Sequence, residues 1–531
     1  MKTPTLLLFI LAFNCSVFAQ SYQFEVILKD KDTLLYKTST PSDFLTSKSI
    51  LRKSQHLVNV TIEDFPVSLN YLDSLNKYFA VKAISKWFNL SVVQTNDSMS
   101  IDTLKKFPFV ESFKFIGKSG FSVTRVSAQT ASNEIDYGSA STGINQVQGE
   151  HLHDNNYLGE GVTIAVLDAG FSNVNTMDIF DSLYIENRIL HQKNFIFPSN
   201  DIYELNTHGT QVLSILAGNK EGEYVGSAPK AKYIILITED AREENLIEEY
   251  IWINGAEYAD SLGTDIITSS LGYNTFDTPE FDHLQSQLGK STVMISRGAK
   301  KASEKGILVI TSAGNEGDSP WEDLLFPADE ELVLTIGSVN DQGTYSSFSS
   351  SSPSGLGFVK PNVVALGEKI STSSESGIYS KADGTSYSCP LITGLAACLW
   401  QALPSKSSAE IKEIIEQSAH QYNAPDNFIG YGIPNFSQTI EHAIIIDQRT
   451  SQSTLFPNPA LNNQVTLKHL PSLEVLKVEL YDNTGHELEQ VIYYEIDNTL
   501  TLTLLPHLLK GSYFLKFNTT LGIIRKQIIV N

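Results

Sequence analysis

Between about Gly159 and Phe436, short apolar runs alternate with stretches whose apolar residues recur at helical spacing. The runs are almost continuously apolar, as strands must be when both faces of a parallel sheet are covered. Five such runs occupy residues 162–168, 232–238, 265–271, 307–311 and 332–337. Strands and helices in alternation build a doubly wound α/β sheet, whose chemistry lies at the carboxyl ends of the strands. We therefore predict such a domain here, with its site residues at or just after the runs.

The residues before this domain have a different pattern and predict a small α+β unit. Its expected elements are a helix with Val67, Tyr71, Leu72 and Leu75 on one face, a strand over 84–93, a short helix over 101–106 and a strand over 109–115. Residues 120–145 are then rich in Ser, Thr, Ala, Gly and Asn, which is typical of a flexible or cleavable linker.

The last segment, from Leu455 to Asn531, consists of short strands with alternating apolar positions. Turn signals separate them at Asp482–Gly485 and Lys510–Gly511. This pattern predicts a small β-sandwich of about 75 residues.

The first 20 residues have the features of an export signal: a basic Lys2, an apolar run from Leu6 to Phe13, and small residues around Val17–Ala19 for cleavage. The apolar run is too short to span a bilayer, and no later stretch is apolar for long enough. We expect a secreted or cell-surface protein without a membrane span.

The net charge limits the classes of partner that the protein can bind, and the cysteine content limits how the fold is stabilised. The chain of 531 residues has a formal net charge of −22 and no basic stripe, which argues against nucleic acid and anionic lipid as partners. After removal of the signal, only Cys389 and Cys398 remain. On one helix they would be roughly 13 Å apart, beyond disulfide reach. Stability must therefore come from burial of a core.

The stretch Gly384–Gly394 places two hydroxyls and a thiol at the expected start of an apolar helix. We expect Pro390 in the first turn, where a missing N–H is tolerated. At that end the N–H of Ser386 is free to bind an anion, and the helix dipole favours negative charge. Ser388 and Cys389 lie further into the helix and are less able to present both a side chain and a free N–H. Ser386 is therefore the favoured nucleophile.

Three further polar residues stand where a site would need them. Asp168 ends the first apolar run, His208 opens a helix, and Asn315 lies in a glycine-flanked turn after a buried strand. Each also has an ordinary explanation: a cap or turn former for Asp168, a solvated helix start for His208, and a turn former for Asn315. The asparagine amide can, on the other hand, donate to a developing oxyanion. Taken singly, these residues leave both explanations open.

The motifs occur in the order aspartate, histidine, asparagine, serine along one parallel α/β domain. This order and each local motif resemble the subtilisin-like serine peptidases. The resemblance covers about residues 140–440 and includes Ser269–Gly272, which is like the family's substrate-lining strand, and Gly430–Asn435 near its end. It implies a serine endopeptidase that acts on proteins or peptides through an acyl-enzyme intermediate.

The same resemblance implies a role for each site residue. Ser386 would be the nucleophile, His208 its general base and then general acid, and Asp168 the group that orients the imidazole. Asn315 and the N–H of Ser386 would form the oxyanion hole. The residues implied to contact substrate are Ser270, Leu271, Gly272, Ala313 and Gly314.

The sequence departs from the family pattern at three places near these residues. Gln211 replaces a frequent second histidine, Ala169 replaces the usual hydroxyl after the aspartate, and Tyr387-Ser388-Cys389 replaces the common Met-Ala-Ala. No departure removes a triad atom. Ala169 puts in doubt one hydrogen bond near Asp168, and Tyr387 is expected to alter the packing around the nucleophile.

The flanking units also resemble known domains. Residues 20 to about 120 resemble the family's inhibitory propeptides, which assist folding and block the active site until cleaved. The C-terminal segment resembles the type A sorting domains of the type IX secretion system of Bacteroidetes, on the motifs at 455–459, 480–485 and 511–516. A carbohydrate-binding or structural sandwich is the alternative there.

These resemblances imply four parts and their partners. The parts are a signal peptide (1–19), a propeptide-like α+β domain (20–120), a peptidase domain with an N-terminal linker (121–446) and a sorting sandwich (447–531). The partners are then peptide substrates, the chain's own propeptide and the secretion machinery.

Other sites find less support. Gly159-Glu-Gly161 is like part of a dinucleotide loop, but it precedes its strand and lacks a third glycine. His151 and His153 lie two apart in an expected polar loop, where solvated histidines are commoner than metal ligands. We assign no metal site and no cofactor: calcium commonly stabilises this family, but the residues define no ligand set. The competing function is a catalytically silent, surface-displayed binding protein on a peptidase fold, against which the intact Asp168, His208, Asn315 and Ser386 argue.

Overall fold

The computed structural model describes most of the chain from residue 21 to residue 530. Its described ranges are 21–56, 58–96, 101–117, 135–197, 201–374, 376–440, 454–461, 464–468, 475–481, 487–490, 492–496, 499–504, 508–519 and 522–530. The expected signal peptide, most of the expected linker after residue 120, the segment 441–453 and the turn at 482–485 lie outside the described residues.

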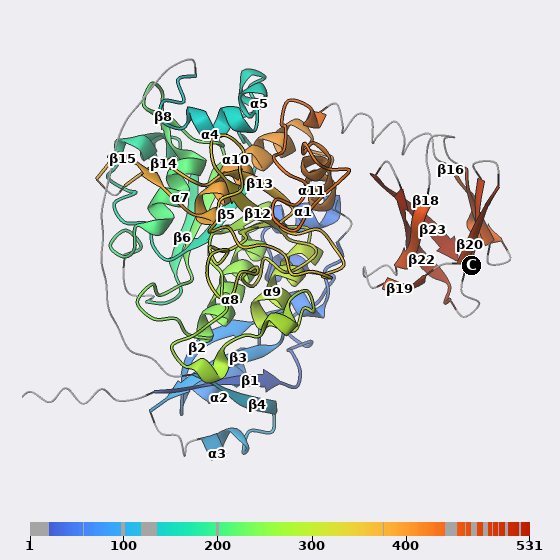
Figure 1. Ribbon diagram of the computed structural model, residues 1–531. Coiled ribbons are helices and arrows are strands. Elements are labelled where there is room, and N and C mark those ends of the chain that lie inside the picture. Colours follow the sequence, from blue (N-terminus) through green and yellow to red (C-terminus); the bar gives the residue numbers. More distant parts are fainter. Residues whose placement is uncertain are drawn as a thin grey trace, which may run out of the picture.

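The central domain is built on a seven-stranded sheet of order β13-β12-β11-β10-β5-β9-β6, in which every pairing is parallel (Figure 1). Its strands are β5 (Thr163–Asp168), β6 (Ile189–Asn194), β9 (Lys232–Ile237), β10 (Ile266–Ser269), β11 (Leu308–Ser312), β12 (Leu334–Val339) and β13 (Val363–Leu366). Each of the five predicted runs contributes a strand, so the predicted α/β sheet is confirmed. The two edge strands, β6 and β13, were not predicted; β6 is largely exposed and so has no continuous apolar run.

Helices cover both faces of this sheet because side chains alternate along its strands. Ile164 and Val166 of β5 point into one core with α7 (His208–Ala217), α10 (Thr385–Ala402) and α11 (Ser408–Gln417). Ala165 and Leu167 point to the opposite face, into a core with α8 (Ile247–Leu262) and α9 (Met294–Glu304). The remaining elements are α4 (Ser141–Gln146), α5 (Glu150–Asp154), α6 (Asp181–Ile185), β7 (Asn219–Lys220), β8 (Tyr224–Val225), β14 (Ile370–Ser373) and β15 (Tyr379–Ala382).

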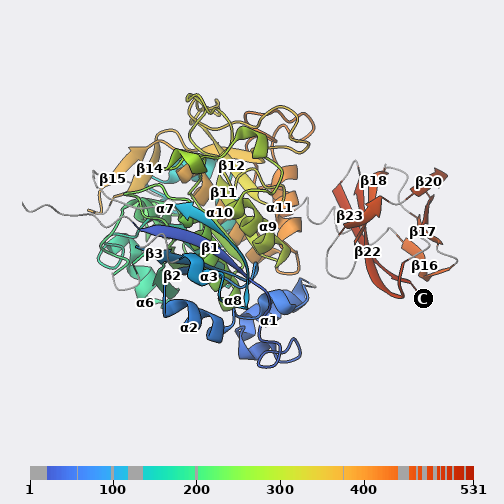
Figure 2. The same cartoon turned by 90° about the horizontal axis from the view of Figure 1, so that it is seen from below.

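The N-terminal domain is an antiparallel sheet of order β2-β3-β1-β4 with three helices, as its predicted α+β class requires. Its elements are β1 (Tyr22–Leu28), α1 (Ser47–Gln55), α2 (Leu69–Asn76), β2 (Ala80–Ser85), β3 (Leu90–Thr95), α3 (Ile101–Leu104) and β4 (Val110–Gly117). The sheet packs against α8, seen from below in Figure 2. Ala83, Trp87 and Val92 thereby belong to the same apolar core as α8 and α9.

The prediction of one strand over residues 84–93 is wrong. A turn at residues 86–89 divides it into the hairpin β2–β3, and Asn89 in that turn has a φ of 49°. The carboxylate of Glu257 on α8 accepts hydrogen bonds from the backbone N–H groups of Lys86 and Trp87, at 2.7 and 2.9 Å. A contact with another domain thus turns the chain at a place where the local pattern is still that of a strand.

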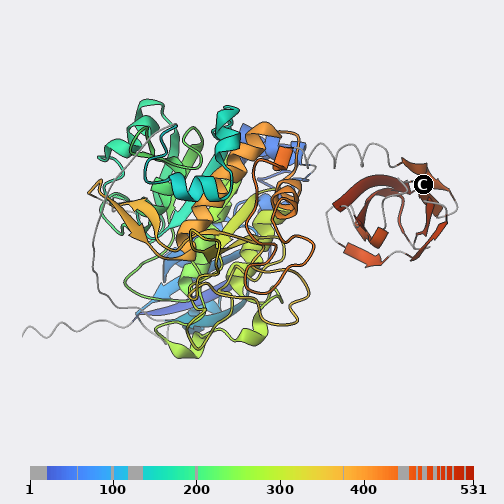
Figure 3. The same ribbon diagram turned by 45° about the horizontal axis from the view of Figure 1, so that its top comes forward.

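The C-terminal segment forms two four-stranded antiparallel sheets, drawn in red in Figure 3. One has the order β16-β17-β21-β20 and the other β19-β18-β22-β23. Leu467 and Leu502 of the first sheet share a core with Leu480 and Phe517 of the second, which confirms the predicted sandwich. The strands are β16 (Thr454–Leu461), β17 (Gln464–Lys468), β18 (Val475–Tyr481), β19 (Glu487–Gln490), β20 (Ile492–Ile496), β21 (Thr499–Thr503), β22 (Gly511–Thr519) and β23 (Gly522–Val530). Over the described ranges, no helix is both long enough and apolar enough to cross a membrane.

Candidate active site

Asp168 and His208 meet at the carboxyl end of β5. Nδ1 of His208, the first residue of α7, lies 2.9 Å from Oδ1 of Asp168. The approach needs a glycine after the histidine, because a Cβ at Gly209 would lie 2.4 Å from the carbonyl oxygen of Gly170 and 3.0 Å from Cβ of Asp168. Asp168 is fully buried, whereas the His208 side chain is 27% exposed. The imidazole therefore has one nitrogen on a buried carboxylate and another face open to solvent.

The charges around His208 favour its protonated form. Burial lowers the pKa of His208, but the charge of Asp168, the hydrogen bond to it and the charge of Glu239 raise that pKa more, so it lies above its ordinary value. Oδ1 of Asp168 also accepts a hydrogen bond from the N–H of Ala169, at 2.8 Å. Oδ2 has no partner among the described residues, in agreement with the doubt that Ala169 raised about a hydrogen bond here.

Ser386 is the second residue of α10, which begins just after Gly384 with its φ of 151°. A backbone N–H in that position has no acceptor within the helix. The Ser386 hydroxyl donates to the carbonyl of Ser270 at 3.2 Å, and among the described residues it makes no hydrogen bond to His208. The residue after it, Tyr387, packs near the histidine, with its ring centroid 6.0 Å from that of the His208 imidazole.

Pro390 lies in the second turn of α10, not in the first turn as predicted. A proline inside a helix leaves the carbonyl four residues earlier without its donor. That carbonyl belongs to Ser386, and the hydroxyl of Ser270 donates to it at 2.8 Å. Ser270 therefore fixes the start of α10 next to the strand β10.

Two competing nucleophiles in the same stretch are turned inward. Cys389 is fully buried, and burial raises the pKa of its thiol to about 11. Ser388 is also fully buried, and its hydroxyl donates to the carbonyl of Thr385 at 3.1 Å. Neither group reaches the solvent-exposed edge of the sheet. Cys389 and Cys398 are both free and buried on α10, so the expectation that they do not pair is confirmed.

Asn315 follows β11 and is exposed. Its Oδ1 accepts two hydrogen bonds from Thr385, one from the N–H at 2.9 Å and one from the hydroxyl at 3.0 Å. The amide nitrogen is thereby turned the other way, and Nδ2 lies 3.7 Å from where a Cβ on Gly384 would stand. Thr385 was not singled out from the sequence, where only its place beside Ser386 marks it.

The two segments predicted to contact substrate extend neighbouring parallel strands, since Ser269 of β10 is in register with Thr311 of β11. Within the described structure, the backbone N–H and C=O groups of Leu271 and Gly272 have no hydrogen-bond partners, which leaves an edge for an extended peptide. The backbone N–H and C=O groups of the other segment, Ala313 and Gly314, already have hydrogen-bond partners within the protein. Ala313 bonds through its N–H to Ile336 and through its carbonyl to Leu325, while Gly314 bonds to Thr385 and Ser350.

Two of the departures from the family pattern contact each other. The hydroxyl of Tyr387 donates to Oε1 of Gln211 at 3.0 Å, and Nε2 of Gln211 donates to the hydroxyl of Thr372 at 3.3 Å. Tyr387 thus occupies a fixed position near His208, whereas its bond to Gln211 was not predicted.

The prediction of a polar loop at His151 and His153 is wrong, because both lie on α5 and His153 is only 2% exposed. A hydroxyl from Tyr137 lies 3.0 Å from its Nδ1, and the carbonyl of Ser227 lies 3.1 Å from its Nε2. Across the described ranges, no group of three or more His, Cys, Asp or Glu side chains is placed to hold a metal ion.

Comparisons with known proteins agree with this geometry. The Subtilase family profile matches residues 159–432, the Peptidase S8 propeptide domain of Bacteroidota matches 23–134, and the secretion system C-terminal sorting domain matches 454–531. The match to the first of these covers the whole of the sheet and its site.

Individual relatives are similar over the same region. Subtilisin E of Bacillus subtilis (strain 168) is 29% identical over 298 residues, which are 55% of this chain and 69% of the relative. The major intracellular serine protease of the same organism is 30% identical over 273 residues, 50% of this chain and 76% of the relative.

Among solved structures, the epidermin leader peptide processing serine protease of Staphylococcus aureus superposes with a TM-score of 0.54 at 16% identity. It covers 80% of this chain and 98% of its own, and shows that the fold is shared. With its matched catalytic domain, propeptide and sorting domain, the chain belongs to the subtilase family and is a secreted, subtilisin-like serine endopeptidase.

Proposed function

We propose that Ser386 attacks the scissile carbonyl and that His208 first takes its proton and then delivers it to the leaving amine. The observation that carries this assignment is the bond between His208 and the buried Asp168 at the sheet edge where α10 begins. The attack forms a tetrahedral intermediate, whose collapse releases the amine and leaves an acyl-enzyme. Water, deprotonated by His208, then hydrolyses the ester and restores the serine.

Asp168 keeps the imidazole oriented and stabilises the imidazolium formed in each step. The same attraction between the Asp168 carboxylate and the imidazolium raises the pKa of His208. The hydroxyl of Ser386 must leave the carbonyl of Ser270 to reach His208. Rotation about the Cα–Cβ bond of Ser386 would move the hydroxyl away from that carbonyl, and catalytic hydrogen bonds commonly tighten only when substrate is bound.

The oxyanion hole would consist of the N–H of Ser386 and the amide of Asn315. The bonds from Thr385 to Oδ1 of Asn315 hold the amide with its N–H groups outward before substrate arrives. Donors held in place in this way need no reorganisation when charge develops on the oxygen, which is the main source of their effect.

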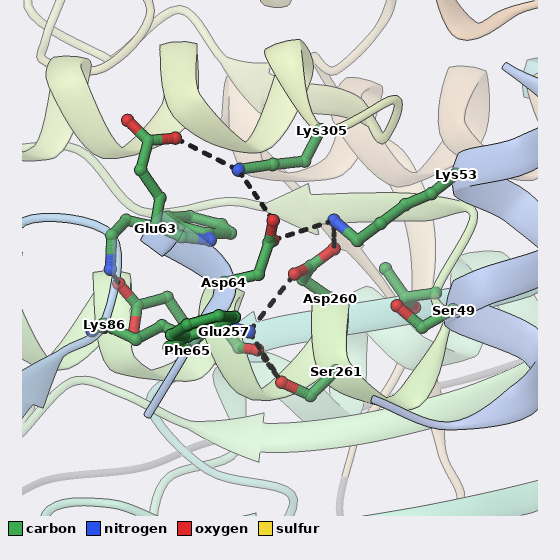
Figure 4. A network of polar contacts seen from close by, with 12 residues as sticks. Ser49, Lys53, Glu63, Asp64, Phe65, Lys86, Glu257, Asp260, Ser261 and Lys305 are labelled. Carbon is green, nitrogen blue, oxygen red and sulfur yellow. Dashed lines mark hydrogen bonds and ion pairs between the residues drawn. The ribbon is translucent and has the colours of Figure 1, made fainter. Parts of the chain in front are cut away.

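We also propose that the N-terminal domain, residues 20–120, is an inhibitor docked on α8 and α9 through a buried ionic cluster. Figure 4 shows Asp260 of α8 between Lys53 and Lys86 of that domain. Their ammonium groups lie 3.0 and 3.2 Å from its carboxylate, and Arg52 donates to the same group. Burial raises the pKa of Asp260, but these three cations lower it far more.

The remaining boundaries follow from the expected segments. A cut between about residue 120 and residue 135 would separate the inhibitor from a peptidase domain at 121–446. The sandwich at 447–531 would address the chain to the secretion machinery and be removed by another peptidase. The family profiles at 23–134 and 454–531 support this division.

Paired substitutions test the assignment of the nucleophile. Ser386→Ala should abolish peptide hydrolysis and, if maturation is autocatalytic, the N-terminal cut, while Cys389→Ala should retain most activity. Mass spectrometry of both secreted proteins reports the cut directly. A Ser386→Ala protein that still cleaves peptides, with an inactive Cys389→Ala, would reverse the assignment.

A further inference from the structure

Leu325 occupies the space between residues 270–272 and residues 313–314, the two segments that the family resemblance implies contact the substrate. It lies in the connection from β11 to β12, and its N–H donates to the carbonyl of Ala313 at 3.0 Å. The next residue, Phe326, exchanges backbone hydrogen bonds with Tyr273, at 2.9 and 3.1 Å. The backbone around Leu325 is thus held by Ala313 and, through Phe326, by Tyr273, the residue after Gly272.

The side chain of Leu325 faces a glycine in each segment. A Cβ built on Gly272 would lie 2.8 Å from Cβ of Leu325 and 3.1 Å from its Cδ1. A Cβ built on Gly314 would lie 2.6 Å from Cγ of Leu325 and 3.1 Å from the same Cδ1. One leucine therefore fills the room that both glycines leave.

Leu325 is also the residue of its segment that can meet a ligand. Leu324 and Phe326 on either side are fully buried, whereas Leu325 is partly exposed. Its neighbours in the structure are the open backbone edge at Leu271 and Gly272 and the turn that carries Asn315. Its exposed surface consequently faces the place where a bound peptide would run.

The position of the reacting carbonyl decides which substrate residue meets this leucine. Its carbon must lie at Ser386, which is tied to Ser270, and its oxygen at Asn315, which follows Gly314. The residue that supplies this carbonyl, the acyl-side residue, then directs its side chain between the two segments. A large side chain would overlap Leu325, and a packed, backbone-anchored leucine yields only at a cost.

We propose that Leu325 restricts the acyl-side residue of the substrate to small side chains such as Gly, Ala and Ser. The inference rests on the proposed role of Ser386 and adds the substrate class to it. The selection acts by exclusion, since a pocket already filled by a leucine offers a bulky residue no apolar surface to bury.

The experiment compares two peptides that differ only in the acyl-side residue, Ala or Phe, with the matured wild-type enzyme and with Leu325→Ala. We expect wild-type kcat/KM to be about tenfold or more higher for the Ala peptide. Leu325→Ala should raise kcat/KM for the Phe peptide by about tenfold or more and change the Ala peptide little. Leu332→Ala is the matched control. That leucine is 38% exposed and lies before the amino end of β12, whereas the site lies at the carboxyl ends of the strands.

Labelling of Ser386 by a fluorophosphonate, measured on each protein, distinguishes a failure of the Leu325 proposal from a failure of the proposed nucleophile. Equal wild-type rates on both peptides with Ser386 labelled would overturn the role of Leu325. The role of Leu325 would also be overturned if Leu325→Ala is labelled at Ser386 but keeps the wild-type ratio of kcat/KM between the Ala and Phe peptides. If Leu325→Ala fails to mature, Leu325→Val replaces it, with a smaller gain expected on the Phe peptide. A wild-type enzyme that hydrolyses peptides without labelling at Ser386 would overturn the proposed function instead.

Discussion

Nδ1 of His208 lies 2.9 Å from Oδ1 of Asp168, and the aspartate is fully buried while the histidine reaches solvent. A charge pair with one buried partner is stronger than the same pair in water, because the surrounding dielectric is lower. The imidazolium that forms during catalysis is stabilised by this arrangement. A second carboxylate, Glu239, acts on the same histidine from further away.

Replacement of Glu239 by glutamine should move the acidic limb of kcat/KM to lower pH. The negative charge of Glu239 raises the pKa of His208, so its removal lowers the pH at which His208 becomes protonated and loses its function as a base. Burial and the charge of Asp168 raise the pKa of Glu239 itself to about 7. We expect a shift of less than about one pH unit. A pH–rate profile measures it, with Glu304→Gln on α9 as the control, and a shift to higher pH would be inconsistent with this electrostatic account.

Asn315→Ala should lower kcat by on the order of 10²–10³ and leave KM almost unchanged. This is the effect that removal of one oxyanion donor has in subtilisin itself. The reason is that the amide, held by Thr385, bonds to the oxygen mainly in the transition state. Steady-state kinetics on one peptide suffice. A loss of equal size carried by KM alone would assign Asn315 to substrate binding.

The stability of the central domain should fall as pH drops from about 6.5 to about 4 because of His153. Burial lowers the pKa of His153 to about 4. In this interval the unfolded state binds a proton that the folded state does not, so the free energy of unfolding decreases with falling pH, by about 3 kcal/mol in all. Above pH 6.5 both states are neutral at this residue and the effect vanishes.

Denaturant unfolding of the Ser386→Ala protein, which cannot digest itself, measures this dependence at a series of pH values. His153→Gln should remove that part of the slope, since glutamine can still donate to the carbonyl of Ser227 but does not titrate in this range. His151→Gln, on the exposed side of the same helix, is the control and should leave the slope as it is. The same slope in His153→Gln as in the parent protein would show that other groups cause it.

Asp260→Asn should weaken the hold of the cleaved N-terminal domain on the enzyme by about a hundredfold or more. Loss of one partner from a buried ion pair costs about 3 kcal/mol or more, because the remaining charges stay buried. Here Arg52, Lys53 and Lys86 would all lose the carboxylate they share. Inhibition of the enzyme by the separated domain measures the change. Glu304→Gln, whose side chain is 38% exposed, should have little effect, and equal inhibition in both variants would exclude Asp260 as the main anchor.

The sheet and the site residues could be predicted because the features that specify them are local. Strands covered on both faces need continuous apolar runs, and the runs ending near Asp168 and Asn315 identified the edge where the site lies. Its place at the expected start of a helix, where its N–H is free, then favoured Ser386 over Ser388 and Cys389. The burial of Cys389 is consistent with that choice.

The remaining features depend on contacts between residues distant in the sequence. Glu257 is more than 160 residues from the turn at Lys86 and Trp87 that it holds, so no local pattern could break the predicted strand. The start of α10 likewise depends on the bond from Ser270 to the carbonyl of Ser386. Leu325 lies in a connection without periodic pattern, and only the folded chain brings it against Gly272 and Gly314.

The central claim is that Ser386 is the nucleophile activated by His208, and covalent labelling of the matured protein with a fluorophosphonate tests it most directly. After proteolytic digestion, mass spectrometry locates the modified residue. The account predicts one adduct on Ser386, no adduct in Ser386→Ala, and slow labelling in His208→Ala because the hydroxyl then lacks its base. An unlabelled wild-type protein, or an adduct on another residue that persists in Ser386→Ala, would contradict it.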